Sequence, residues 1–534
     1  MTQTKAVATG LRETSRPVRD WTAGGGLLWT AVVAGVYTIV QLVFVVPGSG
    51  LGWDETVYTS QVSRAASDTA FFSAPRARGI TFLIAPVTSL TSSVDVLRVY
   101  LALLSGAGLF LALWVWRRLL PASVLALAGA LFAGLWITVY YGPQVMPNLW
   151  VALGCLCAVG LFLRAARDRT DRTALIGLGV AVAFVALMRP TDAFWLTAPL
   201  ALIALAVRRW RRWALLAALA VGGAVGCAEW IIEAYVSYGG LFTRLARASE
   251  IQGHLGWNLV FGDHMRSLDG RLLCRPCDIR WRRPATAIWW FALPLLTLGG
   301  VLVAARLRRL PLVLVPTLVG LSMAAQYLLL IGYAAPRFLL PVYALLALPT
   351  ALFLTWLMRT ARPRALVVTL LVAAAVAHLW VQGSVVADRA ERSRVDRGKF
   401  DLIAAEFARQ GVTPPCVVSG TEAIRVAFRI GCASRQTGGH DGSITPSELV
   451  AVAREKPVAF VVAGEAGPPA YARDWRVERI PDLPGLRNCR AYLSPSARAE
   501  PDAQRGVRER GLRQLLGDDH RGEDLLVHAR GGAV

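Results

Sequence analysis

Two acidic residues and a short basic segment share one polar loop near the start of the chain. The loop begins GWDETVY, with Asp54 and Glu55, and continues to APRARG, with Arg76 and Arg78. A carboxylate at a membrane surface can serve as a general base or bind a divalent cation, and arginines there suit a phosphate. The alternatives are a helix N-cap at Asp54, opening a helix over 55–65, and contact of the arginines with lipid headgroups.

Further ionisable residues stand near the ends of apolar segments, where they become functional candidates by default. They are Arg98, Arg189, Asp192, Glu229, Glu233 and Arg337. Arg189 and Asp192 can pair with each other, while Glu229 and Glu233 share one helical face and can simply be wetted. A later polar loop adds His254, Asp263 and His264, which we rank below the others.

The elements that must position these residues are membrane helices. Of the 534 residues, 55% are hydrophobic, and they fall into runs of about 17–25 residues, each able to cross about 30 Å of hydrocarbon. We expect an all-α polytopic protein of about eleven spans. The expected spans are 26–46, 95–115, 121–140, 148–164, 173–188, 194–207, 213–233, 286–305, 310–332, 338–358 and 364–382.

The arginines predict the orientation. Those between spans occupy alternate loops, which places residues 1–25 in the cytoplasm and the loops 47–94 and 234–285 outside. The net charge of +22 is explained by this topology, and no basic-aromatic module predicts nucleic-acid binding. Lysine is nearly absent, which is typical of a GC-rich bacterial genome. We therefore expect a bacterial plasma (inner) membrane location, with membrane lipids as neighbours.

Residues 386–496 lose the long apolar runs and alternate short helices and strands, which predicts a small extracytoplasmic α/β domain. Residues 497–534 carry no aromatic residue and are expected to be disordered. Outside the membrane disulfides persist, and the spacing favours a Cys416–Cys432 bond. Cys274 and Cys277 favour a local disulfide over a zinc half-site or a redox pair.

Over about residues 26–385 the chain resembles the GT-C membrane glycosyltransferases, specifically protein O-mannosyltransferases and lipid A aminoarabinose transferases. The resemblance rests on Asp-Glu-x-x-Tyr in the first outer loop, then Pro-Arg-x-Arg-Gly, then the sequence RFLLP from Arg337. It implies that Asp54 is the catalytic carboxylate, with Glu55 beside it, and that Arg337 contacts the phosphate of a lipid-linked sugar. The Lys/Pro-rich segment of aminoarabinose transferases is replaced here by APRARG.

The resulting prediction is a glycosyltransferase that moves a sugar, with inversion, from a polyprenyl-phosphate donor to a cell-envelope acceptor such as a glycan, lipid or protein. Asp54 deprotonates the acceptor hydroxyl, and Arg76, Arg78 and Arg337 stabilise the leaving phosphate. Alternatively, Asp54 and Glu55 hold Mg²⁺ or Mn²⁺ for that purpose. The supporting residues are Tyr58, Arg98, Arg189, Asp192 and Glu229.

Two other classes of protein stay open. A transporter or lipid flippase also needs many helices and intramembrane charges, but no internal repeat is visible between the halves of the chain. A non-catalytic envelope-assembly protein would not need Asp54, Glu55 or Arg337. The predicted cytoplasmic loops are short and carry no Gly-rich phosphate loop, which argues against a nucleotide-driven reaction.

Overall fold

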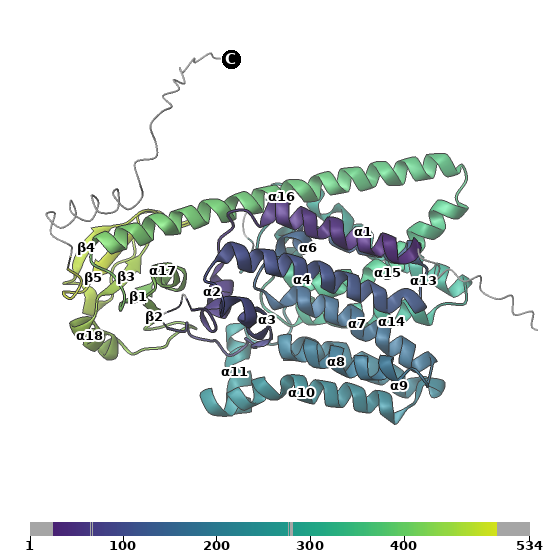
Figure 1. Cartoon of the computed structure of the whole chain (residues 1–534), viewed down its shortest axis with the longest axis horizontal. Coiled ribbons are helices and arrows are strands. Elements are labelled where there is room, and N and C mark those ends of the chain that lie inside the picture. Colours follow the sequence, from purple (N-terminus) through teal and green to yellow (C-terminus); the bar gives the residue numbers. More distant parts are fainter. Residues whose placement is uncertain (1–24, 65, 67, 276, 278–280, 499–534) are drawn as a thin grey trace, which may run out of the picture. The chain divides into compact units, whose positions relative to one another are not determined.

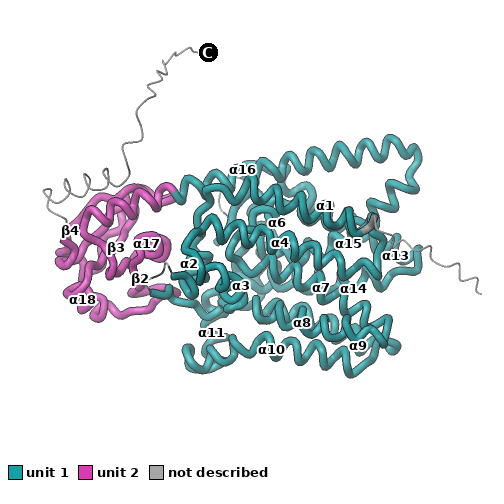
Figure 2. The backbone as a smooth tube through the Cα atoms, viewed as in Figure 1, with its two compact units in different colours: residues 1–397 teal, residues 398–534 magenta. Residues whose placement is uncertain are grey.

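The computed structural model describes residues 25–498, apart from 65, 67, 276 and 278–280 (Figure 1). The expected N-terminal segment and tail therefore lie almost wholly outside the described residues. The described chain divides into two compact units after Arg397, coloured separately in Figure 2.

The first unit is a helical bundle, and eight of its described helical stretches are long and apolar enough to cross a membrane. They are α1 (Gly25–Val40) with a π-helical turn (Gln41–Val45), α4 (Val94–Val115), α7 (Pro147–Arg167), α10 (Trp213–Ser237), α13 (Ile288–Arg306), α14 (Pro311–Leu329), α15 (Leu340–Thr360) and α16 (Arg364–Arg409). Most side chains of α7 and α15 are buried within the bundle. The chain is a multi-pass membrane protein.

The other three expected spans coincide with shorter apolar helices. They are α5 (Ala122–Ala133) followed by α6 (Trp136–Tyr141), α8 (Arg172–Met188) and α9 (Pro190–Ala206). The expected single span 121–140 is thus wrong, because the chain is extended at Leu135 between the two helices. The freed backbone N–H of Trp136 donates to Oε1 of Gln382 at 2.9 Å, which satisfies the start of α6.

The polar loops carry short helices that bear on the site. The loop before α4 contains α2 (Trp53–Ser60) and α3 (Gly79–Thr88), and the loop before α13 contains α11 (Leu241–Ile251) and α12 (Phe261–Ser267). The helix expected over 55–65 is therefore shorter and begins two residues earlier than 55. Single 3₁₀ turns lie at Trp116–Arg118, Arg208–Trp210, Pro284–Ala287, Pro336–Leu339 and Ala470–Ala472.

The helix α16 differs from the expectation at its end. The helix of the expected span 364–382 continues without a break to Arg409. The division between the two compact units falls after Arg397, within this helix.

The second unit is the expected α/β domain, with a five-stranded sheet in the order β2-β1-β3-β5-β4. Its elements are β1 (Val417–Gly420), α17 (Ala423–Ile430), β2 (Ala433–Ser434), α18 (Pro446–Glu455), β3 (Val458–Val462), β4 (Arg476–Arg479) and β5 (Arg490–Leu493). β1 pairs in parallel with β2 and β3, and β5 is antiparallel to β3 and β4.

Alternation along the central strands supplies two cores in the second unit, one on each face of the sheet. Val418 and Val461 pack with α17 and Phe407, whereas Val417 and Val462 pack with α18. Cys416 and Cys432 are disulfide-bonded within the first of these cores. A capping box at Thr445 begins α18.

Candidate functional site

The start of α2 separates the roles of the two adjacent carboxylates. Gly52 is the N-cap, and its backbone N–H donates to Oε2 of Glu55 at 2.8 Å. Glu55 therefore completes the cap that the sequence allowed for Asp54. Because Asp54 lies one residue earlier in the first turn, its carboxylate is left to bond with residues from distant segments.

Asp54 lies between two guanidinium groups. Nη2 of Arg76 donates to Oδ1 of Asp54 at 2.7 Å, and Nη2 of Arg337 donates to Oδ2 at 3.0 Å. The side chains of Arg76 and Arg337 are 11% and 10% exposed, while that of Asp54 is 34% exposed. The cluster thus has two largely desolvated cations and one carboxylate that solvent can still reach.

Arg76 is anchored by its own loop and by α2. Its Nε donates to Oγ of Ser73 at 3.0 Å, and its guanidinium carbon lies 5.4 Å and 5.1 Å from the ring centroids of Trp53 and Tyr58. The nearby Gly79 allows close approach of the backbone, because a Cβ there would lie 2.6 Å from the carbonyl oxygen of Leu187. Tyr58, expected in a supporting role, makes a cation–π contact with Arg76.

Arg337 is positioned by a pairing between two loops. Its Nη1 donates to the carbonyl of Leu272 at 2.9 Å and approaches the hydroxyl of Tyr141 at 3.4 Å. Just beside these contacts, Cys274 and Ala334 exchange two backbone hydrogen bonds, at 2.8 and 3.1 Å. Cys274 is disulfide-bonded to Cys277, which restrains the loop that contacts Arg337.

A third arginine adds positive charge to this region. Arg189 forms an ion pair with Asp192 at 3.0 Å, and both Arg189 and Arg337 lie against the ring of Phe338. Together with Asp54, this set has three guanidiniums and two carboxylates, leaving one net positive charge. Such an excess at a weakly hydrated site favours binding of an anion.

The charges decide the protonation state of Asp54. Burial alone raises the pKa of its carboxyl, but Arg76 and Arg337, with a smaller contribution from Arg189, outweigh burial and hold that pKa below its usual value. Asp54 is therefore a carboxylate at neutral pH.

Glu55 occupies a different environment, in which every lone-pair direction is used. Arg98 donates to both carboxylate oxygens, at 2.5 and 2.9 Å, and the backbone N–H of Val145 donates to Oε1 at 2.6 Å. Arg98 itself is fully buried and also donates to the carbonyls of Gly50 and Pro143. Glu55 and Arg98 thus join three segments of the bundle.

The two adjacent carboxylates do not suit a shared metal ion. The oxygens of Glu55 are occupied by Arg98, Val145 and the Gly52 cap, and the oxygens of Asp54 are occupied by Arg76 and Arg337. A divalent cation needs several carboxylate or carbonyl oxygens around one point. No group of three or more His, Cys, Asp or Glu side chains that suits a metal occurs among the described residues.

Arg78 belongs to a third cluster. Its Nη2 donates to Oε1 of Glu233 at 2.5 Å, and its Nε lies 3.4 Å from Oε1 of Glu229. The fully buried Arg244 donates to Oε2 of Glu233 at 2.8 Å and to the carbonyls of Ala74 and Arg76. Arg244 was missed in the sequence, where the only signal was the amphipathic stretch Leu241–Ile251.

The lower-ranked histidine of the α12 loop is structural. Burial lowers the pKa of His264 to about 4, and its Nε2 lies 3.2 Å from the carbonyl of Tyr327. It is consequently neutral at physiological pH. Asp263 accepts a hydrogen bond from the backbone N–H of Cys277, which is the second cysteine of the Cys274–Cys277 disulfide.

The fold of this chain is similar to the folds of ArnT and of an archaeal oligosaccharyltransferase, which agrees with the resemblance seen in the sequence. ArnT from Cupriavidus metallidurans bound to undecaprenyl phosphate matches with a TM-score of 0.61 and 14% identity, over 90% of this chain and 100% of that chain. Its apo state matches with a TM-score of 0.58 and 14% identity, over 89% and 99% of the two chains.

A second similar protein is archaeal. The Archaeoglobus fulgidus oligosaccharyltransferase tethered with an acceptor peptide matches with a TM-score of 0.50 and 13% identity, over 83% of this chain and 70% of that chain. Comparison with protein-family models and with curated protein sequences finds no match. At these identities the likeness is one of fold.

Proposed function

We propose that this protein transfers a sugar from a polyprenyl-phosphate donor to an acceptor outside the cytoplasm. The observation that carries the proposal is the clamp of Asp54 between Arg76 and Arg337, in a region with excess positive charge. The GT-C fold supports it, since the similar ArnT structure contains undecaprenyl phosphate. The alternatives of a transporter and of an assembly protein explain the helices but not this clamp.

The donor phosphate binds by exchange with the carboxylate. Arg76 and Arg337 are held by Ser73, Leu272 and aromatic rings, so their guanidiniums stay in place when an anion replaces Asp54 as their partner. A planar guanidinium matches a phosphate with two parallel hydrogen bonds. Arg78 is committed to Glu233, and the proposal therefore rests on Arg76 and Arg337 alone.

Asp54 then acts as the general base. Once the phosphate neutralises the two arginines, the charges that hold the pKa of Asp54 down are compensated, and its proton affinity rises. The acceptor oxygen attacks the anomeric carbon while its proton passes to Asp54. The bond from that carbon to the phosphate oxygen breaks, and the arginines stabilise the additional negative charge on the departing polyprenyl phosphate.

One displacement of this kind inverts the configuration at the anomeric carbon. The orientation that the arginines predict places α2 and the clamp on the outer side of the bacterial inner membrane. Reporter fusions after Arg118 and after Arg309 should then report the cytoplasm, and a fusion after Gly270 should report the outside.

A transfer assay with the purified full-length protein tests the function. The protein is reconstituted with a panel of polyprenyl-phosphate sugars and envelope extracts as acceptors, and the anomeric configuration of the product is determined. Donor-dependent release of polyprenyl phosphate with an inverted product supports the proposal. Donor binding without release of polyprenyl phosphate would instead support the flippase alternative.

A further inference from the structure

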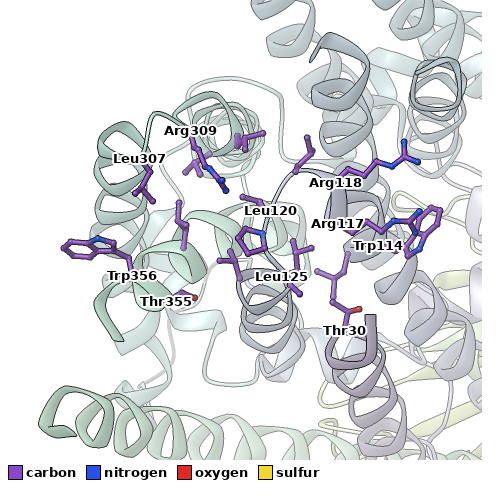
Figure 3. Close-up of a pocket in the computed structure, with 18 of the residues that line it drawn as sticks. Thr30, Trp114, Arg117, Arg118, Leu120, Leu125, Leu307, Arg309, Thr355 and Trp356 are labelled. Atoms are coloured by element: carbon purple, nitrogen blue, oxygen red, sulfur yellow. The ribbon is translucent and has the colours of Figure 1, made fainter. Parts of the chain in front are cut away.

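A second basic site lies at the other end of the helical bundle. A cavity of about 1110 Å³ opens between the start of α1, the turn after α4, the start of α5, the α13–α14 connection and the end of α15 (Figure 3). Among its described lining residues, five are arginines and none is acidic. The arginines are Arg117, Arg118, Arg167, Arg309 and Arg359.

This cavity is separate from the Asp54 clamp. α4 links the two regions, because Arg98 on its first turns braces Glu55 and Arg117 follows its last residue, Val115. At 1.5 Å per residue, the backbones of Arg98 and Arg117 are about 28 Å apart along the helix axis. An anion in the cavity therefore cannot contact Arg76 or Arg337.

The walls of the cavity are apolar and its rim is basic. Leu120, Leu125 and Val313 form part of the wall and are buried, at 5%, 2% and 0% exposure. Arg118 and Arg309 are exposed, and the Arg117 guanidinium stacks 3.6 Å above the ring of Trp114 (Figure 3). A soluble anion would use only the rim, whereas an amphiphile with an anionic head uses both rim and walls.

The position in the fold indicates the kind of amphiphile. The rim lies at the ends of membrane helices, and Trp114 and Trp356 border it, as tryptophans do at the level of lipid headgroups. Basic pockets between membrane helices bind anionic headgroups, while acyl chains follow the apolar wall.

We propose that this cavity binds one anionic glycerophospholipid of the surrounding membrane. Arg117 and Arg309, from opposite sides of the opening, contact its phosphate, and the apolar wall contacts the first part of its acyl chains. The inference is independent of the proposed transfer reaction, because it concerns different residues and a lipid that does not react.

Native mass spectrometry of the full-length protein in neutral detergent tests the site. The titrated probes are phosphatidylglycerol, phosphatidylcholine and undecaprenyl phosphate. We expect one phosphatidylglycerol to bind in clear preference to phosphatidylcholine. The double variant R117Q/R309Q should lose about tenfold to thirtyfold in affinity, since each arginine near such a surface contributes about 1 kcal/mol.

The matched control is R208Q/R306Q, which removes the same charge from exposed arginines that do not line the cavity. Equal binding of the two phospholipids, or an equal loss in the control, would overturn the proposal. A loss of undecaprenyl phosphate binding in R117Q/R309Q that exceeds the loss of phosphatidylglycerol binding would overturn it as well. If the double variant does not fold, the wild-type protein is crosslinked to a photoactivatable phosphatidylglycerol, and the labelled residues are identified. Labelling within 113–125 and 307–313 supports the site, and labelling confined to other segments contradicts it.

Discussion

Two charge clusters start from neighbouring residues of one helix, the Asp54 clamp with its two arginines and the ion pair of Glu55 with Arg98. The two carboxylates differ in exposure and in hydrogen-bond partners. The Glu55 side chain is 6% exposed and accepts from one buried arginine and two backbone N–H groups. The Asp54 side chain is 34% exposed and accepts from two arginine side chains, Arg76 later in the same loop and Arg337 from the turn before α15.

On the proposed function, this difference separates a structural ion pair from one that takes part in the reaction. A buried carboxylate with every acceptor site filled cannot release a partner without a large penalty. A partly exposed carboxylate between two anchored arginines can exchange its partners for another anion. The same acidic dipeptide thus fixes the start of α2 through Glu55 and leaves Asp54 available for chemistry.

The largest effect should come from Asp54→Asn. Loss of a general base typically lowers the rate by about 10²–10⁴-fold, so sugar transfer should nearly vanish while thermal unfolding changes little. The measurement is initial transfer rate per folded protein. Asp95→Asn serves as the control, because Asp95 is also an arginine-paired carboxylate, with Arg397 at 2.7 Å. A comparable loss of rate in that control would mean that Asp54 matters no more to the reaction than another arginine-paired carboxylate.

The next effect concerns stability. Glu55→Gln leaves Arg98 buried without its counter-charge, and breaking such a pair costs about 3–5 kcal/mol of stability. We expect a much lower unfolding temperature in detergent. The double variant Glu55→Gln, Arg98→Met should recover part of that loss. If Glu55→Gln were stable but inactive, Glu55 would have a chemical role and the comparison would fail.

A smaller effect is expected at Arg337. Arg337→Ala removes a charge-assisted contact of about 1.5–3 kcal/mol, so donor affinity should fall roughly ten- to a hundredfold. Arg337→Lys should restore only part, because an ammonium lacks the planar fork. Arg78→Ala is the control for charge, and its donor affinity should stay close to that of the wild type. Equal losses in both variants would indicate a general electrostatic effect.

The smallest effect is expected from chelation. Because Asp54 and Glu55 do not share a cation site, excess EDTA should leave the transfer rate unchanged. A metal-dependent glycosyltransferase treated in parallel shows that the chelator works. Loss of transfer that Mg²⁺ or Mn²⁺ restores would mean that Asp54 exchanges its arginines for a metal.

The sequence predicted the membrane helices well, because the composition of each segment decides whether it lies in lipid or in water. Long apolar runs mark the helices, and arginines mark the loops between them. It also singled out Asp54, Arg76 and Arg337, although only the GT-C resemblance related such distant segments to one another. The sequence did not predict which charged residues form ion pairs with Glu55 and Arg78. Arg98 and Glu233 lie in helices whose packing decides which charge they face, and the break at Leu135 depends on Gln382 of a distant helix.

Donor binding by Asp54→Asn tests the central claim most directly, because the claim is that the donor phosphate takes the place of this carboxylate. The Kd of the polyprenyl-phosphate sugar is measured without acceptor for the wild type and for Asp54→Asn, alongside transfer by the same preparations. We predict equal or tighter binding by the variant, since Arg76 and Arg337 no longer have a competing anion, together with loss of transfer. Weaker binding by the variant, or transfer at the wild-type rate, would contradict the account.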